Sequence, residues 1–354
     1  MTFRMPLMML VMNLITILIV WVGARGVDLG TMQVGDMMAF ISYTMQIIMA
    51  FLMISMVSIM LPRASVSADR IDEILVTKAT ILEPKTSKVG EMVTKGVIEF
   101  DHVHFSYPHA KEEVLNDISF KANPGETIAF IGSTGSGKST LVNLIPRFYD
   151  VTKGRILIDG VDIKDIKLSE LRYKLGLVPQ KGVLFSGTIE SNIKFGNEKA
   201  DENEMERAAR IAQALEFIKE RPGGYDSEIS QGGSNVSGGQ KQRLSIARAI
   251  AKNPDIYIFD DSFSALDFKT DVVLRAALKK EIKESTVLIV AQRISTIINA
   301  DQIIVLDEGK VAGIGTHKEL LEGCEVYRQI AMSQLSEKEL GIKEIELKEV
   351  TKDE

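Results

Sequence analysis

A glycine-rich segment with the pattern Gly, four residues, Gly, Lys and Ser or Thr offers the clearest chemistry in the sequence. Glycines let the backbone curl so that several N–H groups face one anion, and a helix N-terminus adds its positive end. Lys138 would neutralise the β- and γ-phosphates of a nucleotide, and the Ser139 hydroxyl could bind Mg²⁺. The segment therefore predicts a phosphate-binding loop made of Gly132, Ser133, Thr134, Gly135, Ser136, Gly137, Lys138, Ser139 and Thr140.

A carboxylate in a second segment complements that loop. Asp260 follows the apolar residues Ile256–Phe259, which are typical of a buried strand. An Asp that emerges at a strand end beside a phosphate loop is placed to hold Mg²⁺, directly or through water. Together the two segments predict a site for a magnesium nucleoside triphosphate.

A second Gly- and Ser-containing segment, which can form an anion-binding nest of backbone N–H groups, opens another expected helix. It consists of Ser237, Gly238, Gly239 and Gln240. A second anion site within one monomer would be redundant, whereas two such domains that face each other could each lend this nest to the other's nucleotide. The segment resembles the signature sequence of ATP-binding-cassette (ABC) proteins, with Val236 where Leu is usual. The resemblance implies that the nucleotide is ATP, bound with Mg²⁺, and that this nest acts in trans.

Other landmarks of the family follow in order. Tyr107 matches the aromatic residue that stacks on adenine, although a half-exposed strand aromatic would look the same. Gln180 matches the glutamine that meets Mg²⁺ and senses the membrane part. Residues 227–233 are similar to the coupling segment of exporters, with Gln231 where Glu is usual. The loop that crosses the dimer interface in the family is matched by Ser264, Ala265, Leu266 and Asp267.

Two positions depart from the catalytic pattern of the family. Asp261 stands where a Glu usually polarises the attacking water, and Gln292 replaces the usual switch histidine. Asp is one methylene shorter than Glu, and a misplacement of about 1 Å can cost roughly 10²-fold in rate. Gln292 can hydrogen-bond a γ-phosphate oxygen but cannot take up a proton as His can. We expect Asp261, Gln292 and Lys138 to form a catalytic site that holds ATP and cleaves it slowly; tolerated drift in an active enzyme is the alternative.

This pair of departures resembles the degenerate subunit of heterodimeric bacterial multidrug-type ABC exporters. The resemblance implies an ATP-binding and permease subunit that works with a second half-transporter to export apolar or amphipathic substrates. Three alternatives stay open: a regulatory ATP-binding module with little hydrolysis, a homodimeric lipid or peptide exporter, and a soluble ABC ATPase that acts on DNA or the ribosome.

The first part of the chain differs sharply in composition from the rest. Only four charged residues precede Arg63, and 13 of the 16 methionines lie within the first 61 residues. Two apolar stretches, 5–22 and 37–61, are each long enough to cross a bilayer as a helix. Arg63 and Arg70 follow the second stretch and favour a cytoplasmic cassette. We therefore expect a multi-pass protein of the plasma membrane, in contact with the lipid bilayer; a signal peptide in the first stretch is the alternative.

From residue 97 the sequence alternates short apolar strands with helices, which is typical of a parallel α/β core. With the resemblance, the expected fold is an α/β P-loop NTPase, an ABC cassette with a mixed sheet and a helical subdomain, preceded by an all-α segment of two transmembrane helices. The expected limits are 1–76 for the membrane part, 77–96 for a linker, 97–335 for the cassette with its helical subdomain at about 181–245, and 336–354 for a charged tail. Two membrane helices resemble the last two of six in an exporter half, so we expect a truncated form of a longer sequence; four helices supplied by another polypeptide are the alternative.

Composition argues against several other classes of protein. The 42 Lys+Arg and 48 Asp+Glu residues give a net charge of −6, unlike a nucleic-acid binder, which needs a basic surface. One cysteine, Cys324, allows neither an intrachain disulfide nor a cysteine metal cage. The 4 histidines lack the spacing of metal ligands, so a zinc enzyme is not expected.

Overall fold

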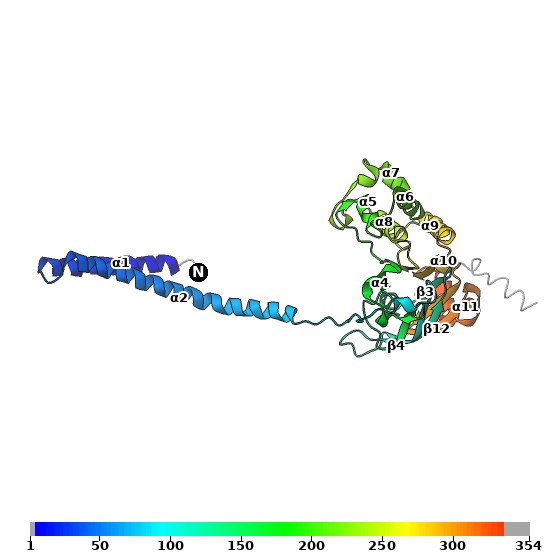
Figure 1. The fold of residues 1–354 in the computed structure, drawn as a ribbon, viewed down its shortest axis with the longest axis horizontal. Helices are drawn as coiled ribbons and strands as arrows, with labels where there is room; N and C mark the ends of the chain where they lie inside the picture. The colour runs from blue at the N-terminus through cyan, green and yellow to red at the C-terminus, as the bar shows by residue number, and fades with distance from the viewer. Residues whose placement is uncertain (1–3, 336–354) are drawn as a thin grey trace, which may run out of the picture. The chain divides into compact units, whose positions relative to one another are not determined.

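The structure is a computed structural model that describes residues 4–335, and the charged tail expected at 336–354 lies outside the described residues. The chain divides into two compact units between Thr80 and Ile81. Figure 1 shows the first unit in blue to cyan and the second in the remaining colours of the sequence.

Two long helices make up the first unit. They are α1 (Arg4–Asp28) and α2 (Val34–Leu75), and they lie side by side (Figure 1). Both are long and apolar enough to cross a membrane. Helix α2 continues through Pro62, so the second apolar stretch and the segment after it form one helix. No residue of α2 is buried in the described structure, so lipid or further helices would have to cover its apolar side chains.

The segment expected as a linker at 77–96 divides at the boundary between the units, and its later part packs with the second unit. The guanidinium of Arg147 donates to the carbonyl of Leu82 at 3.0 Å. The carboxylate of Glu83 accepts from the backbone N–H of Leu168 at 3.1 Å. Hydrogen bonds therefore hold this part of the chain on the cassette.

Three sheets form the framework of the second unit (Figure 1). The central sheet has six strands in the order β12-β11-β3-β10-β9-β6, all parallel except β12. Their bounds are β3 (Thr127–Gly132), β6 (Leu175–Val178), β9 (Ile256–Asp260), β10 (Thr286–Val290), β11 (Gln302–Asp307) and β12 (Lys310–Gly315). An antiparallel sheet with the order β2-β1-β4-β5 contains β1 (Ile98–Phe105), β2 (Leu115–Ala122), β4 (Lys153–Ile158) and β5 (Val161–Asp162). The third sheet pairs β7 (Gly187–Thr188) with β8 (Glu228–Ile229).

Helices surround these sheets, and a group of them forms a separate helical part that Figure 1 shows at the top of the unit. The helices of that part are α5 (Ile189–Lys194), α6 (Glu202–Ile211), α7 (Leu215–Glu220) and α8 (Gly238–Ala251). The others are α3 (Lys138–Leu144), α4 (Leu168–Tyr173), α9 (Phe268–Glu281), α10 (Ile294–Ile297), α11 (His317–Gly323) and α12 (Glu325–Gln334).

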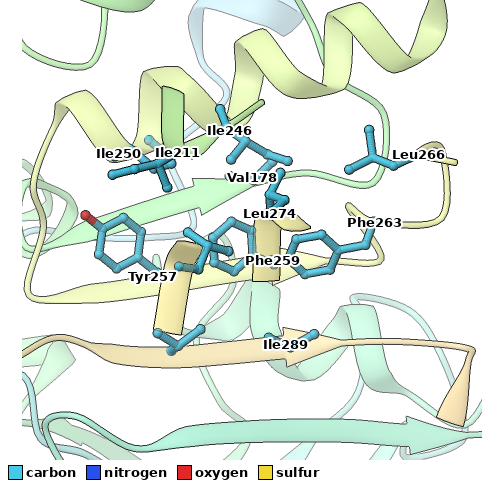
Figure 2. Close-up of a cluster of buried hydrophobic side chains, with 14 of the residues drawn as sticks. Val178, Ile211, Ile246, Ile250, Tyr257, Phe259, Phe263, Leu266, Leu274 and Ile289 are labelled. Carbon is cyan, nitrogen blue, oxygen red and sulfur yellow. The ribbon is translucent and has the colours of Figure 1, made fainter. Parts of the chain in front are cut away.

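The central sheet is buried on both faces, as the side chains of β9 show. Ile256 and Ile258 belong to one hydrophobic cluster, whereas Tyr257 and Phe259 belong to the other. Figure 2 shows the second cluster, in which Ile246 of α8 lies above the sheet. Successive strand residues point to opposite faces, and a parallel sheet covered on both sides needs apolar residues at both. The α/β cassette preceded by two long apolar helices, as expected from the sequence, is confirmed.

Candidate nucleotide site

Parallel strands bring the predicted site residues to one edge of the central sheet. Strands β3, β10, β9 and β6 are neighbours in that order, with Phe130 opposite Val290 and Val290 opposite Asp260. The phosphate loop follows β3, Gln292 follows β10 and Gln180 follows β6. Because the carboxyl ends of parallel strands meet at one edge, segments far apart in the sequence converge there.

The shape of the phosphate loop depends on its glycines. Gly135 and Gly137 have φ angles of 86° and 96°, a region that residues with a Cβ rarely adopt. Gly132 packs so closely against β11 that a Cβ there would lie 2.0 Å from the carbonyl oxygen of Leu306. The loop can therefore keep its curl, with backbone N–H groups available to an anion, only with glycine at these positions.

A Gly132→Ala variant should weaken the binding of MgATP about tenfold or more, because the added methyl group forces the loop or β11 to move. Gly160→Ala is the matched control: Gly160 also has a positive φ and a Cβ there meets nothing within 4 Å among the described residues, but it lies in the turn between β4 and β5, outside the phosphate loop. Titration with a fluorescent ATP analogue measures both affinities, and circular dichroism checks the fold. Equal affinities for the two variants would contradict the close packing at Gly132.

The ammonium group of Lys138 lies inside the loop. It donates to the carbonyls of Gly132 (2.9 Å) and Ser133 (2.6 Å) and to the hydroxyl of Ser136 (3.2 Å). Burial lowers the pKa of Lys138, and the two neighbouring carboxylates oppose that shift. A cation in this place fits the predicted role of meeting the phosphate oxygens.

Ser139 and Asp260 are joined at the end of β9. The Ser139 hydroxyl donates to the Asp260 carboxylate at 2.9 Å. Desolvation raises the pKa of Asp260 above its usual value, and the hydrogen bond from Ser139 opposes the rise. The two side chains offer oxygen donors of the kind that Mg²⁺ prefers, and Mg²⁺ at nucleotides takes few protein ligands besides the phosphates. These residues therefore fit Mg²⁺ bound together with a nucleoside triphosphate.

Three side chains that the sequence analysis singles out separately are joined through the carboxylate of Asp261. Atom Oδ2 of Asp261 accepts a hydrogen bond from Nε2 of Gln292 at 2.8 Å and another from Nε2 of Gln180 at 3.0 Å. Asp261 is 7% exposed and has a left-handed backbone conformation with φ of 48°. One carboxylate oxygen is thus held by the loops that follow β10 and β6.

Tyr107 lies beside the helix that follows the phosphate loop. Its hydroxyl is 3.0 Å from Oγ1 of Thr140. Its ring makes edge contacts with Phe105 and Tyr149, with centroids 4.9 Å and 5.2 Å apart. The structure therefore places this aromatic residue near the nucleotide loop, and stacking on adenine stays a prediction.

The signature residues start α8 with a capping box. The Ser237 hydroxyl accepts from the N–H of Gln240 (3.2 Å), and the Gln240 side chain accepts from the N–H of Ser237 (3.1 Å). Ser237 and Gly238 are exposed, whereas Val236 is buried in the core. A Cβ at Gly239 would lie 3.5 Å from the carbonyl oxygen of Ala265, so Gly239 lies next to the segment 264–267.

The loop that the sequence predicts at a dimer interface, residues 264–267 (the interface loop), connects Asp261 to α9. Ser264 and Ala265 are exposed, Leu266 is buried, and the Ser264 hydroxyl donates to the carbonyl of Asp261 at 2.8 Å. Asp267 caps α9 by accepting from the backbone N–H of the third residue after it at 2.9 Å, and this hydrogen bond lowers the pKa of its carboxyl. The loop is therefore fixed at both ends while its middle faces outward.

The phosphate loop lines a cavity of about 490 Å³, which is within the range of pockets for molecules of nucleotide size. Gln180 and Gln292 also line it, whereas no signature or interface-loop residue does within the described part of the chain. Three residues of the C-terminal helix α12 complete the wall: Ile330, Ser333 and Gln334. Sequence reasoning missed these three, because nothing in the composition or spacing of that helix indicates phosphate chemistry.

The fold and the loop together define a P-loop ATPase domain, and comparisons with known proteins narrow the class. Residues 115–264 match the family model of the ABC transporter domain. An ABC transporter ATP-binding protein of Mycobacterium tuberculosis, itself described as uncharacterized, is 46% identical over 333 residues, covering 93% of this chain and 57% of the relative. A putative multidrug export ATP-binding/permease protein of Bacillus subtilis is 41% identical over 301 residues, covering 85% of this chain and 52% of the relative.

A solved structure of a bacterial Atm1-family ABC exporter with ATP bound matches with a TM-score of 0.77 and 35% sequence identity, covering 93% of this chain and 58% of that one. The chain contains an ABC transporter domain, as its motifs predict. It spans a little more than half the length of these relatives.

Proposed function

We propose that this chain is the ATP-binding and permease subunit of an ABC exporter, that its own ATP site hydrolyses slowly, and that it works with a second, different half-transporter. The family, the cassette fold and the export function named for the Bacillus relative support the exporter. The contacts of Asp261 support slow hydrolysis at this chain's own ATP site, and therefore a pair of half-transporters whose two ATP sites differ (an unequal pair).

The single observation that carries the slow site is the double hydrogen bond to Asp261. In the family pattern this position polarises the attacking water, and the switch residue faces the γ-phosphate. Here the short carboxylate of Asp261 is held by Gln292 at 2.8 Å and by Gln180 at 3.0 Å. A carboxylate drawn back between two amide groups is poorly placed to reach a water beyond the γ-phosphate, and amides cannot take up its proton.

The exposed signature supports catalysis in trans. Ser237 and Gly238 face outward at the N-terminus of α8, where backbone N–H groups and the positive helix end favour an anion. The cavity around Lys138 takes none of its described lining residues from this segment. The intact nest would therefore complete the ATP site of the partner, while Lys138, Ser139 and Asp260 would hold MgATP in the slow site.

The first unit supports placement in the cell membrane, with the cassette on the cytoplasmic side. We assign residues 1–76 to the transmembrane part, 77–96 to a linker and 97–335 to the cassette, whose helical subdomain is 181–245. Helices α1 and α2 and the loop between them line an open apolar pocket of about 300 Å³. Its lining residues are Leu18, Ile19, Val22, Gly23, Met32, Met37 and Phe40. Such walls suit apolar or amphipathic substrates, since methionine adapts to varied shapes.

Purification of the tagged chain from membranes of its own host tests the unequal pair. We expect to recover a second ABC half-transporter that carries Glu and His at the positions of Asp261 and Gln292. A Lys138→Ala chain, purified in parallel, should recover the same partner, because the membrane parts hold the pair together without ATP. Recovery of this chain alone, as a homodimer, would contradict the proposal.

The contacts of Asp261 also suit a second candidate, a regulatory ATP-binding module that does not support hydrolysis even with a partner. ATP hydrolysis by the purified pair separates the two. We expect steady phosphate release that depends on the partner's Glu; a pair that binds ATP without turnover would favour the regulatory module.

A further inference from the structure

Gln334, in the last turn of α12, makes two hydrogen bonds to the backbone around Gln292. Its Nε2 donates to the carbonyl oxygen of Gln292 at 2.8 Å, and its Oε1 accepts from the backbone N–H of Ile294 at 2.8 Å. The side-chain amide of Gln334 thus both donates to and accepts from the backbone of this loop, as the backbone of a neighbouring strand would. It fixes the backbone on both sides of Arg293.

The helix that carries Gln334 is firmly anchored. Tyr327 and Ala331 of α12 are fully buried. The Tyr327 hydroxyl also lies 2.7 Å from Nδ1 of His317 in α11. Because these residues fix α12 against the cassette, the Gln334 amide acts on the loop after β10 from a rigid support.

The same helix borders the nucleotide cavity. Ile330, Ser333 and Gln334 line it together with the phosphate loop, Gln180 and Gln292. The backbone that Gln334 holds therefore carries a side chain that faces the place expected for the γ-phosphate. The side-chain amide of the same residue, Gln292, donates to the carboxylate of Asp261.

We propose that Gln334 is a positioning residue that sets the place of Gln292, so that the C-terminal helix tunes how the site distinguishes ATP from ADP. The inference rests on the proposed role of Gln292 at the γ-phosphate. Gln334 acts through the backbone and needs no contact with the nucleotide. Loss of its two hydrogen bonds would free the loop after β10, and the Gln292 amide would meet the γ-phosphate less often.

The test measures the preference for MgATP over MgADP in the full chain, purified in detergent, by displacement of a fluorescent nucleotide. Gln334→Met removes both hydrogen bonds at similar size and should reduce this preference roughly three- to tenfold. Gln334→Glu keeps the acceptor for the Ile294 N–H but sets a carboxylate against the Gln292 carbonyl, and it should reduce the preference as well. Gln329→Met, an exposed change on the same helix, is the matched control and should leave the preference unchanged.

A double-mutant cycle with Gln292→Ala decides between positioning and a general structural effect. If Gln334 acts through Gln292, Gln334→Met has no further effect in the Gln292→Ala chain. A full additional loss in that background would overturn the inference, as would an unchanged preference in Gln334→Met when Gln292→Ala alone reduces it. If Gln292→Ala alone has no effect, the proposed role of Gln292 is wrong and the inference fails with it.

Discussion

Replacing Asp261 by Glu and Gln292 by His together should raise ATP hydrolysis by this chain about 100-fold. The extra methylene moves the carboxylate forward by about 1 Å toward the attacking water, and the replacement of Gln292 removes one of the two amides that hold it. His can accept a proton near neutral pH, which Gln cannot do. A 100-fold gain corresponds to about 2.7 kcal/mol of barrier, a plausible gain for one repositioned catalytic group. Phosphate release by the full chain at high concentration measures it, because in the proposed mechanism two cassettes must pair to complete each site.

The effects of the two single variants on the rate of ATP hydrolysis should not add up to the effect of the double variant. Asp261 and Gln292 hydrogen-bond each other at 2.8 Å, so a change in either alters the surroundings of the other. A control chain with Asp261→Asn and Gln292→His should stay slow, since an amide cannot act as a base. Rapid hydrolysis by the unmodified chain would refute the slow site and indicate an active homodimer.

Gly238→Asp should reduce ATP hydrolysis by the native pair roughly 100-fold, whereas Asp261→Asn should change it by less than about threefold. The aspartate would set a negative charge where the signature meets the partner's γ-phosphate. It should leave the fold of this chain intact, because a Cβ at Gly238 meets no atom within 4 Å among the described residues. An acidic residue in the first turn of a helix is in fact favourable. Steady-state turnover of the complex, purified through a tag on this chain, measures both effects.

Two controls separate charge from size and from folding. Gly238→Asn has nearly the same size without the charge and should cost less activity than Gly238→Asp. Gly323→Ala fills another position with open space, far from any predicted site residue in the sequence, and should leave turnover unchanged. If Gly238→Asp and Asp261→Asn reduced turnover equally, the division into one slow and one fast site would be wrong.

Much of the site could be predicted from the sequence because its motifs are local. The loop from Gly132 to Thr140 follows an apolar strand, and Asp260 ends another. The rule that parallel strands end at one edge then brings them together. The capping pattern of Ser237 and Gln240 is equally local, since three residues of spacing decide it. The structure contains each of these features where the sequence indicates it.

The contacts between loops could not be predicted in the same way. The bonds of Asp261 to Gln180 and Gln292 depend on the positions of three loops that follow different strands. Gln334 hydrogen-bonds the backbone of Gln292 and Ile294, and no sequence motif links α12 to the loop after β10. The same holds for Arg147, which binds the carbonyl of Leu82. Such contacts follow from tertiary packing, which hydrophobic period and motif spacing do not encode.

The most direct test of the slow site uses membranes of the native host, in which the proposed partner would be present. The membranes are incubated with Mg²⁺ and 8-azido-ATP labelled at either the α- or the γ-phosphate, washed and irradiated, and the label on this chain is counted. The account predicts that this chain keeps the γ-label nearly as well as the α-label, because its site holds uncleaved ATP. Retention of the α-label with loss of the γ-label would show that this site cleaves ATP and would contradict the account.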